Sequence, residues 1–247
     1  MKNSKLKIWA VVPARSGSKS VKNKNIKNFD GLPLLAHTIN SAKFSNSFER
    51  IFLLTDSKKY AKIGKKFGAE IPFIRPKKIS HDKSTDNELY MYFINFFRQK
   101  KIKLPSYIAH LSPTVPLRLN KVIEKGIRFF LKNKKKNSSM RSVSEMSQPS
   151  YKTMRIINNK LCSIIKKDFD LNKLNKPRQS YTKTYIPNGL IDILSTKFLI
   201  ENKKTHGKSV IPYITNQFFL DIDTQSDFEL AKIMIKKIKY KSEKYNK

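Results

Sequence analysis

The sequence predicts an α/β fold with a mostly parallel sheet and helices on both faces. Short apolar blocks alternate with longer segments of helical periodicity four times before residue 132. Each apolar block ends in a polar loop, and strands that alternate with helices in this way form parallel sheets covered on both sides. The length of 247 residues suits one such domain with a modest insertion.

Four strand and helix pairs are predicted in the first half of the chain. The predicted strands are residues 6–12, 51–54, 71–74 and 107–111. The helices that follow them are predicted at residues 34–42, 58–67, 85–98 and 120–131. Pro33 suits the opening of the first helix, and Ser57 and Gly68 suit the start and the end of the second. Ligands bind at the carboxyl ends of parallel strands, so the loops after residues 12, 54 and 111 are where chemistry is expected.

The pattern changes after a lysine-rich run at residues 132–136. Residues 146–186 are irregular and poor in apolar residues, and they contain Pro149 and Pro177. We interpret this stretch as an insertion, within a single domain of residues 1–247, that lies over the site or at a dimer interface. The remaining elements are strands at residues 139–145, 189–194, 209–214 and 218–222, and a final helix at about residues 224–239.

The chain is strongly positive, because it has 52 basic and 18 acidic residues and therefore a net charge of +34. Such an excess is typical of proteins that bind nucleic acid or another anionic surface. A basic nucleic-acid-binding protein therefore stays an alternative. The lysines are dispersed, however, and lysine, asparagine and isoleucine are all abundant, as compositional drift would produce. We therefore expect nucleic acid not to be a partner, and a positive field to favour small anionic substrates.

Composition also bears on location and on metal binding. No apolar run is long enough to span a bilayer, and residues 1–5 are basic without the apolar stretch of a signal peptide. Cys162 is the single cysteine, which excludes an internal disulfide. We expect a cytoplasmic protein without a membrane partner. The four histidines lack the spacing of a metal site: His37, His81, His110 and His206.

The loop after the first predicted strand carries the first motif, PARSGSKSVKNKN at residues 13–25. Small residues let backbone N–H groups approach an anion, and Arg15 and Lys19 add charge where a triphosphate would lie. The spacing is neither that of a Walker A loop nor that of a dinucleotide-binding loop. From the residue types alone, an ordinary basic loop stays an alternative.

This run resembles the N-terminal signature of the acylneuraminate (CMP-sialic acid) cytidylyltransferases, P-A-R-x-G-S-K-x-x-x-N-K-N. Relatives that load KDO carry a different loop, closer to A-S-T-R-L-P-G-K. Further motifs resemble the same family in order and over nearly the whole chain. They are TDS at residues 55–57, RP at 75–76 followed by Asp82, Ser84 and Thr85, LSPTVPLR at 111–118, PRQ at 177–179, PNG at 187–189 and LDIDT at 220–224.

The resemblance implies a Rossmann-like nucleotidyltransferase sheet and a homodimer whose inserted segment reaches the partner's site. It implies that CTP and an acidic nine-carbon sugar give a CMP-sugar and pyrophosphate, with Mg²⁺ as cofactor. The implied nucleotide-binding residues are Ala14, Arg15, Ser18, Lys19, Asn23, Thr55, Asp56, Ser84 and Asn188. The implied sugar-binding residues are Ser112, Thr114, Arg118, Arg178 and Gln179. Arg15, Lys19 and Asp223 are expected to be catalytic.

Asp221 and Asp223 are the candidate metal ligands. Residues two apart on a strand face the same way, and two carboxylates beside a triphosphate suit Mg²⁺. From the residues alone, a helix cap beside a solvated charge is the alternative. We expect an in-line displacement in which the anomeric hydroxyl attacks the α-phosphorus of CTP, without a covalent enzyme intermediate. The sequence identifies no general base.

The sugar half of the motifs departs from the family pattern. Ser112 stands where the family usually has glutamine, Val115 where it has serine, and Ile186 where an arginine often precedes P-N-G. Arg178 suits the acceptor's carboxylate, because a guanidinium can bind a carboxylate with two hydrogen bonds. The resemblance implies N-acetylneuraminate or a relative as acceptor, and these departures point to a legionaminic- or pseudaminic-type acid or another 3-deoxy-nonulosonic acid. A KDO cytidylyltransferase is the alternative within the class.

Overall fold

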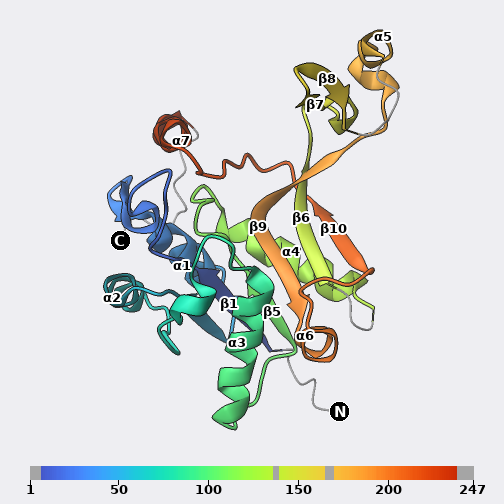
Figure 1. Cartoon of the computed structure of the whole chain (residues 1–247). Helices are drawn as coiled ribbons and strands as arrows, with labels where there is room; N and C mark the ends of the chain where they lie inside the picture. The colour runs from blue at the N-terminus through green and yellow to red at the C-terminus, as the bar shows by residue number, and fades with distance from the viewer. Residues whose placement is uncertain (1–6, 136–138, 165–169, 238–247) are drawn as a thin grey trace.

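Six strands form one sheet at the centre of the computed structural model, which describes residues 7–135, 139–164 and 170–237 (Figure 1). In chain order the strands are β1 (Ile8–Pro13), β4 (Arg50–Leu54), β5 (Tyr107–His110), β6 (Ser139–Glu145), β9 (Tyr185–Ser195) and β10 (Val210–Ile214). Their order across the sheet is β10-β6-β9-β5-β1-β4. Residues 1–6 and 238–239 of the predicted termini lie outside the described residues.

The mostly parallel sheet that the sequence predicts is confirmed. β1 pairs in parallel with β4 and β5, and β10 pairs in parallel with β6. β9 is antiparallel to both of its neighbours, β5 and β6. Five of the six strands therefore run in one direction, and their carboxyl ends meet at one edge of the sheet.

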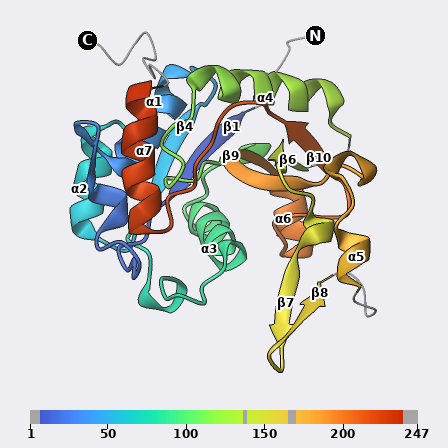
Figure 2. The same cartoon turned by 90° about the horizontal axis from the view of Figure 1, so that it is seen from above.

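Helices cover both faces of this sheet (Figure 2). The helices are α1 (Leu34–Phe44), α2 (Lys58–Lys66), α3 (Asp86–Gln99), α4 (Asn120–Asn133), α5 (Leu171–Leu174), α6 (Thr196–Asn202) and α7 (Gln225–Lys237). Leu35 of α1 and Phe130 of α4 are buried in the core on one face. Phe93 of α3 and Leu199 of α6 are buried in the core on the other. Among the described helices, none combines the length and apolar character that a membrane crossing requires.

The helix signals read from the sequence are local, and the structure bears them out. The Ser57 side chain accepts a hydrogen bond from the Tyr60 amide at the start of α2. Thr85 and Glu88 form a reciprocal capping box at the start of α3. Gly68 follows α2 with a φ of 96°, which a glycine adopts without the steric cost of a side chain.

Two predicted strands are not strands. Residues 71–74 make only an isolated bridge between Thr55 and Ile74 near the outer edge of β4, and Pro72 has no N–H to extend a ladder. Residues 218–222 are irregular, although the Ile222 amide donates to Thr114 O at 2.9 Å. A two-strand turn at β2 (Asn28–Phe29) and β3 (Leu32–Pro33) was not predicted.

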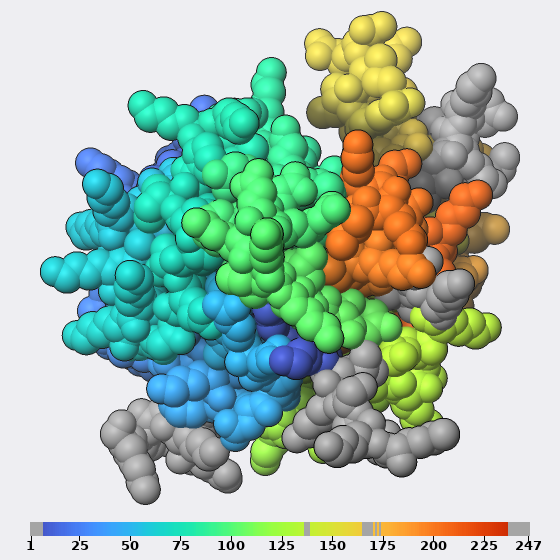
Figure 3. Space-filling model, turned by 90° about the horizontal axis from the view of Figure 1, so that it is seen from below, coloured from blue at the N-terminus to red at the C-terminus, as the bar shows by residue number. Residues whose placement is uncertain are grey.

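The stretch at residues 146–186 is more ordered than predicted. It contains a hairpin of β7 (Met154–Ile157) and β8 (Lys160–Ser163), followed by α5. We call residues 146–164 and 170–184 the arm; residues 165–169 of the predicted insertion lie outside the described residues. The arm projects from the body of the molecule beside β10 and α6, as the space-filling view shows (Figure 3). Its strands therefore lie outside the central sheet.

Candidate active site

The loop after β1 is held at the carboxyl edge of the sheet by Asp56, which stands two residues after the end of β4. The Ser16 amide donates to Asp56 Oδ1 at 2.8 Å, and the Ser16 hydroxyl donates to Oδ2 at 3.0 Å. At the base of the loop, the Ala14 amide donates to Leu54 O at 3.0 Å. Ala14 is buried, and Ser18 lies half-buried further along the loop. Asp56 thus supports the loop, because each of its carboxylate oxygens accepts a hydrogen bond from Ser16.

Arg15 and Lys19 share one carboxylate, that of Asp82. Arg15 Nη1 lies 2.8 Å from Asp82 Oδ1, and Lys19 Nζ lies 2.5 Å from Oδ2. The hydrogen bond from Lys19, and then that from Arg15, lowers the pKa of Asp82 below its usual value. The two cations that the sequence assigns to a triphosphate therefore converge on one anionic group, which shows that their charged ends can reach a common point.

Two asparagines fix the far half of the loop. The Asn25 side-chain Nδ2 donates to Arg15 O at 3.0 Å, which closes the loop on itself. Asn23 has a left-handed backbone with a φ of 55°, a conformation that asparagine tolerates better than most residues. Its Oδ1 lies 3.5 Å from the hydroxyl of Tyr60 in α2. The loop geometry is therefore set by contacts to both β4 and α2.

Asp221 and Asp223 lie beside this loop. Both carboxylates are exposed on either side of the buried Ile222, so the alternation expected of a strand persists without a ladder. Lys24 Nζ lies 3.1 Å from Asp223 Oδ1 and donates to Ile222 O at 2.6 Å. The hydroxyl of Ser20 donates to Asp223 O. Residues about 200 apart in sequence are thus joined at one edge of the sheet.

This carboxylate pair fits the chemistry of a magnesium site. Mg²⁺ prefers oxygen ligands and is usually held by one or two carboxylates together with substrate phosphates. The described residues contain no cluster of three or more His, Cys, Asp or Glu side chains able to hold a metal by themselves. Asp221 and Asp223 would therefore need phosphate oxygens to complete a coordination shell.

Arg118 is buried, and its guanidinium donates hydrogen bonds to backbone carbonyl groups near the loop after β5. Its Nε donates to Leu190 O at 2.5 Å, and its Nη2 donates to the carbonyl oxygens of Ser112 and Gly189, both at 2.8 Å. Its Nη1 donates to Thr38 Oγ1 at 2.9 Å. The sequence assigns Arg118 to the sugar, but its guanidinium is enclosed and fully engaged, so it fixes the loop after β5.

Asn188 has a similar place in the structure. Its Nδ2 donates to Ser144 Oγ at 2.9 Å and to Thr215 Oγ1 at 3.1 Å, and its Oδ1 accepts from the Leu190 amide at 3.2 Å. The side chain is buried, so it joins β6, β9 and the segment after β10 where the sequence had placed it against the nucleotide. Gly189 next to it has a φ of 64°, and a β-carbon there would lie 3.0 Å from Val115.

The other predicted residues of the loops make local hydrogen bonds. Thr55 is buried after β4 and accepts from the Ser57 amide at 3.2 Å, and Ser84 accepts from the His81 amide at 3.0 Å. Ser112 Oγ and Thr114 Oγ1 lie 2.8 Å apart in the half-buried loop after β5.

Arg178 and Gln179 lie in the arm, apart from the loops after β1 and β5. Arg178 Nη2 donates to Glu145 Oε1 at 3.1 Å and to Met146 O at 3.3 Å, and Gln179 is exposed. The structure thus ties Arg178 to the base of the arm. Within this chain it does not join the other predicted sugar-binding residues.

Sequence reasoning did not assign roles to Lys24, Asn25 and Asp82, although all three stand in the quoted motifs. Arg75 is also inside a quoted motif; its guanidinium is buried and donates to Ile79 O at 2.5 Å. Burial lowers the pKa of Arg75, opposed by the nearby carboxylates of Asp56 and Asp86. The sequence nevertheless carried a signal for Lys24, because Lys24 matches the second lysine of the same family signature that contains Arg15.

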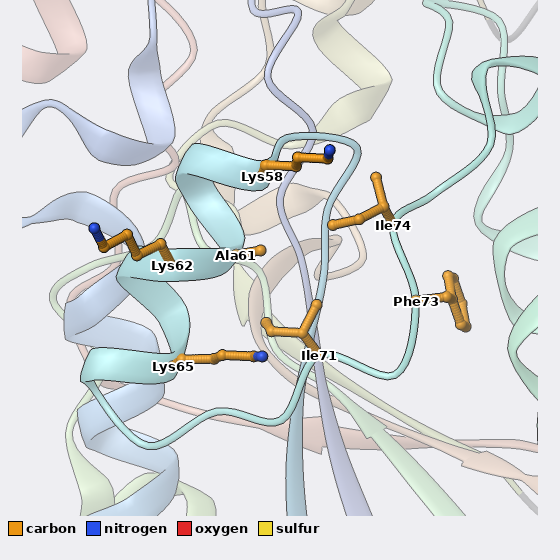
Figure 4. Close-up of a pocket in the computed structure, with 7 residues that line it drawn as sticks. All are labelled: Lys58, Ala61, Lys62, Lys65, Ile71, Phe73 and Ile74. Atoms are coloured by element: carbon orange, nitrogen blue, oxygen red, sulfur yellow. The ribbon is translucent and has the colours of Figure 1, made fainter.

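A groove of about 380 Å³ lies elsewhere, between α2 and residues 71–74 (Figure 4). Apolar side chains line it, and Figure 4 shows Lys58 and Lys65 extending toward residues 71–74 while Lys62 points away. None of its lining residues is one of the predicted site residues: Lys58, Ala61, Lys62, Lys65, Ile71, Phe73 and Ile74. The candidate site is therefore the open carboxyl edge of the sheet and not this groove.

Known proteins are similar to this chain over most of its length. The chain is 31% identical over 230 residues to CMP-N,N'-diacetyllegionaminic acid synthase of Legionella pneumophila, covering 92% of this chain and 95% of the relative. It is 32% identical over 226 residues to N-acylneuraminate cytidylyltransferase of Escherichia coli O18:K1:H7, covering 91% of this chain but 51% of the relative. The chain thus spans about half the length of that relative.

A solved structure of CMP:2-keto-3-deoxy-manno-octonic acid synthetase complexed with CTP shares the fold. The TM-score is 0.67 at 13% identity, and the match covers 94% of this chain and 99% of that one. The sequence profile of the cytidylyltransferases matches residues 9–236. This match covers nearly all of the described sheet, the loop after β1 and the Asp221–Asp223 pair, and the chain therefore belongs to the cytidylyltransferase family.

Proposed function

We propose that this chain transfers CMP from CTP to the anomeric hydroxyl of a sialic-acid-like nonulosonic acid and releases pyrophosphate. The observation that carries the proposal is the meeting of two motifs at the carboxyl edge of the sheet. The loop with Arg15 and Lys19 is joined to the Asp221–Asp223 segment through Lys24 and Ser20. In this proposal the cations of the loop serve the triphosphate and the neighbouring carboxylates serve the metal.

Arg15 and Lys19 hold the triphosphate in this proposal. CTP replaces Asp82 as their partner, because a triphosphate offers several oxygens where Asp82 offers two. The two cations stabilise charge on the departing pyrophosphate, while the loop positions the α-phosphorus for in-line attack. Asp56, Arg118 and Asn188 act as positioning residues, since their polar atoms are engaged within the protein.

Asp221 and Asp223 are the residues that would hold Mg²⁺. When bound, the ion would neutralise charge at the phosphates of CTP. Lys24 keeps the Asp223 segment against the loop by its bond to Ile222 O, whether or not its ion pair with Asp223 is made.

The acceptor is proposed from the relatives. The two relatives above act by name on N-acylneuraminate and on N,N'-diacetyllegionaminic acid, and a pseudaminic acid cytidylyltransferase of Campylobacter jejuni is 27% identical over 234 residues. The structural neighbour is, by name, a CMP:2-keto-3-deoxy-manno-octonic acid synthetase, which keeps KDO as a second candidate acceptor. Ser112 and Thr114 face the acceptor in our proposal, because they are the half-exposed hydroxyls after β5.

A homodimer is proposed from the arm. Its hairpin exposes apolar side chains outside the core, and patches of this kind mark interaction surfaces. A second copy would cover them and carry Arg178 and Gln179 toward the other chain's site. The exposed apolar residues of the hairpin and the segment after it are Met154, Ile156, Ile157, Leu161 and Ile164.

Pyrophosphate release with CTP and a panel of acidic sugars tests the proposal. The panel holds N-acetylneuraminate, legionaminic- and pseudaminic-type acids, and KDO. Release with a nonulosonic acid and not with KDO supports the proposal, and the CMP-sugar is identified by mass. Release with KDO alone would select the second candidate, and UTP serves as the control nucleotide.

A further inference from the structure

The groove between α2 and residues 71–74, which we call the α2 groove, has one wall fixed to β4 (Figure 4). The Glu70 amide donates to Ile51 O at 2.8 Å, and the Arg75 amide donates to Thr55 O at 2.9 Å. Both ends of this wall are thereby bonded to the outermost strand of the sheet, and α2 forms the opposite wall. The groove is therefore preformed by the fold.

The apolar lining of the α2 groove is mostly recessed. Ala61 is buried, and Ile71 and Phe73 are half-buried. The Phe73 ring is anchored by two aromatic rings of α3, whose centroids lie 4.8 and 5.1 Å from its own. Ile74 is 40% exposed. A concave apolar lining of this kind suits apolar side chains that enter from a partner.

The lysines of α2 have no charge partner in the part of the chain that the structure describes. They are Lys58, Lys59, Lys62, Lys65 and Lys66. The first turn of α2 holds two of them and no acidic residue, although the amino end of a helix disfavours cations. Others stand three or four residues apart, where like charges repel. In α7, by contrast, Lys232 pairs with Glu229. An anionic partner would relieve the repulsion along α2.

The cations and the apolar lining belong to one surface. Lys58 extends from α2 toward Ile74, and Lys65 extends toward Ile71 (Figure 4). The two ammonium groups thus stand at either end of the apolar side chains of residues 71–74. A ligand that matches this surface carries apolar groups between negative charges.

Three other occupants match the α2 groove less well. A second copy of this chain carries the same net charge of +34 and is repelled by these lysines. The phosphates of a nucleic acid would pair with the lysines but leave the apolar lining uncovered. A bilayer takes up apolar side chains that protrude, whereas Ile74 is the one exposed apolar residue of the lining.

We propose that the α2 groove is a docking site for an acidic segment of another protein. The apolar side chains of that segment enter the groove, and its carboxylates pair with Lys58 and Lys65. The inference is independent of the proposed function, because none of the lining residues belongs to the candidate active site.

The test measures the affinity of the full chain for labelled glutamate-rich peptides by fluorescence anisotropy, at about 0.15 M salt. The peptides carry leucine and phenylalanine at several spacings. In one matched set serine replaces the apolar residues, and in a second set glutamine replaces the glutamates. At least one acidic apolar peptide is expected to bind about tenfold or more tightly than both of its matched peptides.

Exposed substitutions locate the binding. Lys58→Glu combined with Lys65→Glu is expected to raise the Kd of that peptide by about tenfold or more, because like charges across an interface are strongly disfavoured. Lys121→Glu combined with Lys125→Glu on α4 changes the net charge equally and is expected to raise the Kd less than about threefold. Ile74→Ser is expected to raise it by about fivefold. All five side chains are exposed, and melting temperature checks the fold.

A measurement without substitutions gives the same location. An amine-reactive reagent modifies exposed lysines, and mass spectrometry compares the extent of modification with and without the peptide. The peptide is expected to protect Lys58 and Lys65 and to leave Lys121 and Lys125 unprotected. Equal protection of both pairs would show that the peptide follows the net charge and would overturn the proposal.

Three further outcomes would overturn it. One is that no acidic apolar peptide binds, and another is that binding survives the replacement of leucine and phenylalanine by serine. The third concerns the other occupants, which are tested with phosphatidylglycerol vesicles and with a duplex oligonucleotide. If either binds and is lost in the variant with Lys58→Glu and Lys65→Glu, while no acidic apolar peptide binds, the surface serves a membrane or a nucleic acid and not a protein segment.

Discussion

Asp82 is the residue whose role is most visible in the structure and least visible in the sequence. Its carboxylate forms ion pairs with Arg15 and Lys19, the two cations of the loop after β1 that we propose bind CTP. An internal carboxylate at this place keeps Arg15 and Lys19 oriented before the substrate arrives, and it competes with the substrate for them. Both effects follow from one geometry, and they predict opposite changes in KM for CTP when the carboxylate is removed.

We expect competition to dominate, so Asp82→Asn lowers KM for CTP by about two- to fivefold, the range of exposed ion pairs. The amide keeps the size of the side chain but not its charge. Steady-state kinetics with CTP varied measures the change. Glu201→Gln on α6 removes the same charge at a distance from the site and is expected to leave KM unchanged. A raised KM in Asp82→Asn would show that orientation outweighs competition.

Arg15→Ala is expected to weaken the use of CTP more than Lys19→Ala does. A guanidinium can bind phosphate oxygens through two hydrogen bonds, whereas an ammonium acts as a point charge. The Arg15 side chain is 35% exposed and Lys19 is 84% exposed, so Arg15 is also the better fixed. We expect Arg15→Ala to lower kcat/KM for CTP by an amount that corresponds to a loss of about 1.5–3 kcal/mol in transition-state stabilisation. Lys65→Ala on α2 is the control, and equal kinetics in all three variants would refute the phosphate role of the loop.

Asp223→Asn is expected to keep the fold and lose most of the activity. Its side chain is 74% exposed, and Lys24 retains its bond to Ile222 O. A neutral amide binds Mg²⁺ far less well than a carboxylate does. Turnover against Mg²⁺ concentration, with melting temperature as the check on folding, measures the effect. Added Mg²⁺ should partly restore the variant, and parental rate and Mg²⁺ dependence would show that Asp223 is not a ligand.

At the scale of elements, the helices were predictable because their signals are local. Ser57 and Thr85 each accept a bond from within the first turn of the helix that they begin. The strands predicted at residues 71–74 and 218–222 were wrong. A strand needs a neighbouring strand to bond with, and apolar composition alone does not show whether one is there. Residues 71–74 lie at the outer edge of the sheet with Pro72 among them, and so make one isolated bridge but no ladder.

The hairpin of the arm was missed for a related reason. Its register places Ile156 opposite Leu161 and Arg155 opposite Cys162, so its faces alternate as in any strand pair. The segment has too few apolar residues to form a core of its own, and the sequence therefore resembled an irregular insertion. Only the structure shows that the apolar side chains of the hairpin stay exposed.

This uncovered face predicts the oligomeric state. Ile156 is 72% and Leu161 is 49% exposed, and they form one cross-strand pair. Replacing both with threonine puts β-branched side chains, which suit a strand, at both positions but removes apolar area, so we expect a dimer in the parent and a monomer in the double variant. Light scattering at micromolar concentration measures this. Arg155→Gln, on the other face of the hairpin, should stay dimeric, and a fully active parental monomer would contradict the proposed interface.

At the scale of the whole molecule, the sequence predicted which loops come together but not which of their side chains are buried. The motifs after β1, β4 and β5 meet at one edge, as parallel strands require. Arg118 and Asn188 were assigned to ligands because they stand in motifs, yet both are buried and bonded within the protein. Burial depends on what packs around a side chain, and a motif carries no information on it.

The net charge of +34 also belongs to this scale, and its salt dependence distinguishes the enzyme from the nucleic-acid alternative. Binding to a polyanion releases condensed counterions, so a protein with six to ten phosphate contacts loses roughly three to five orders of magnitude in affinity between about 0.05 and 0.2 M salt. CTP is a short anion without such a counterion layer, and salt only screens its approach. We therefore expect kcat/KM for CTP to fall less than about tenfold over this range. Oligonucleotide binding measured on the same samples should be weak and should not inhibit the reaction. Strong oligonucleotide binding with the steep dependence, together with no CTP turnover, would mean that the charge serves nucleic acid and that the dispersed lysines form a surface that the sequence did not reveal.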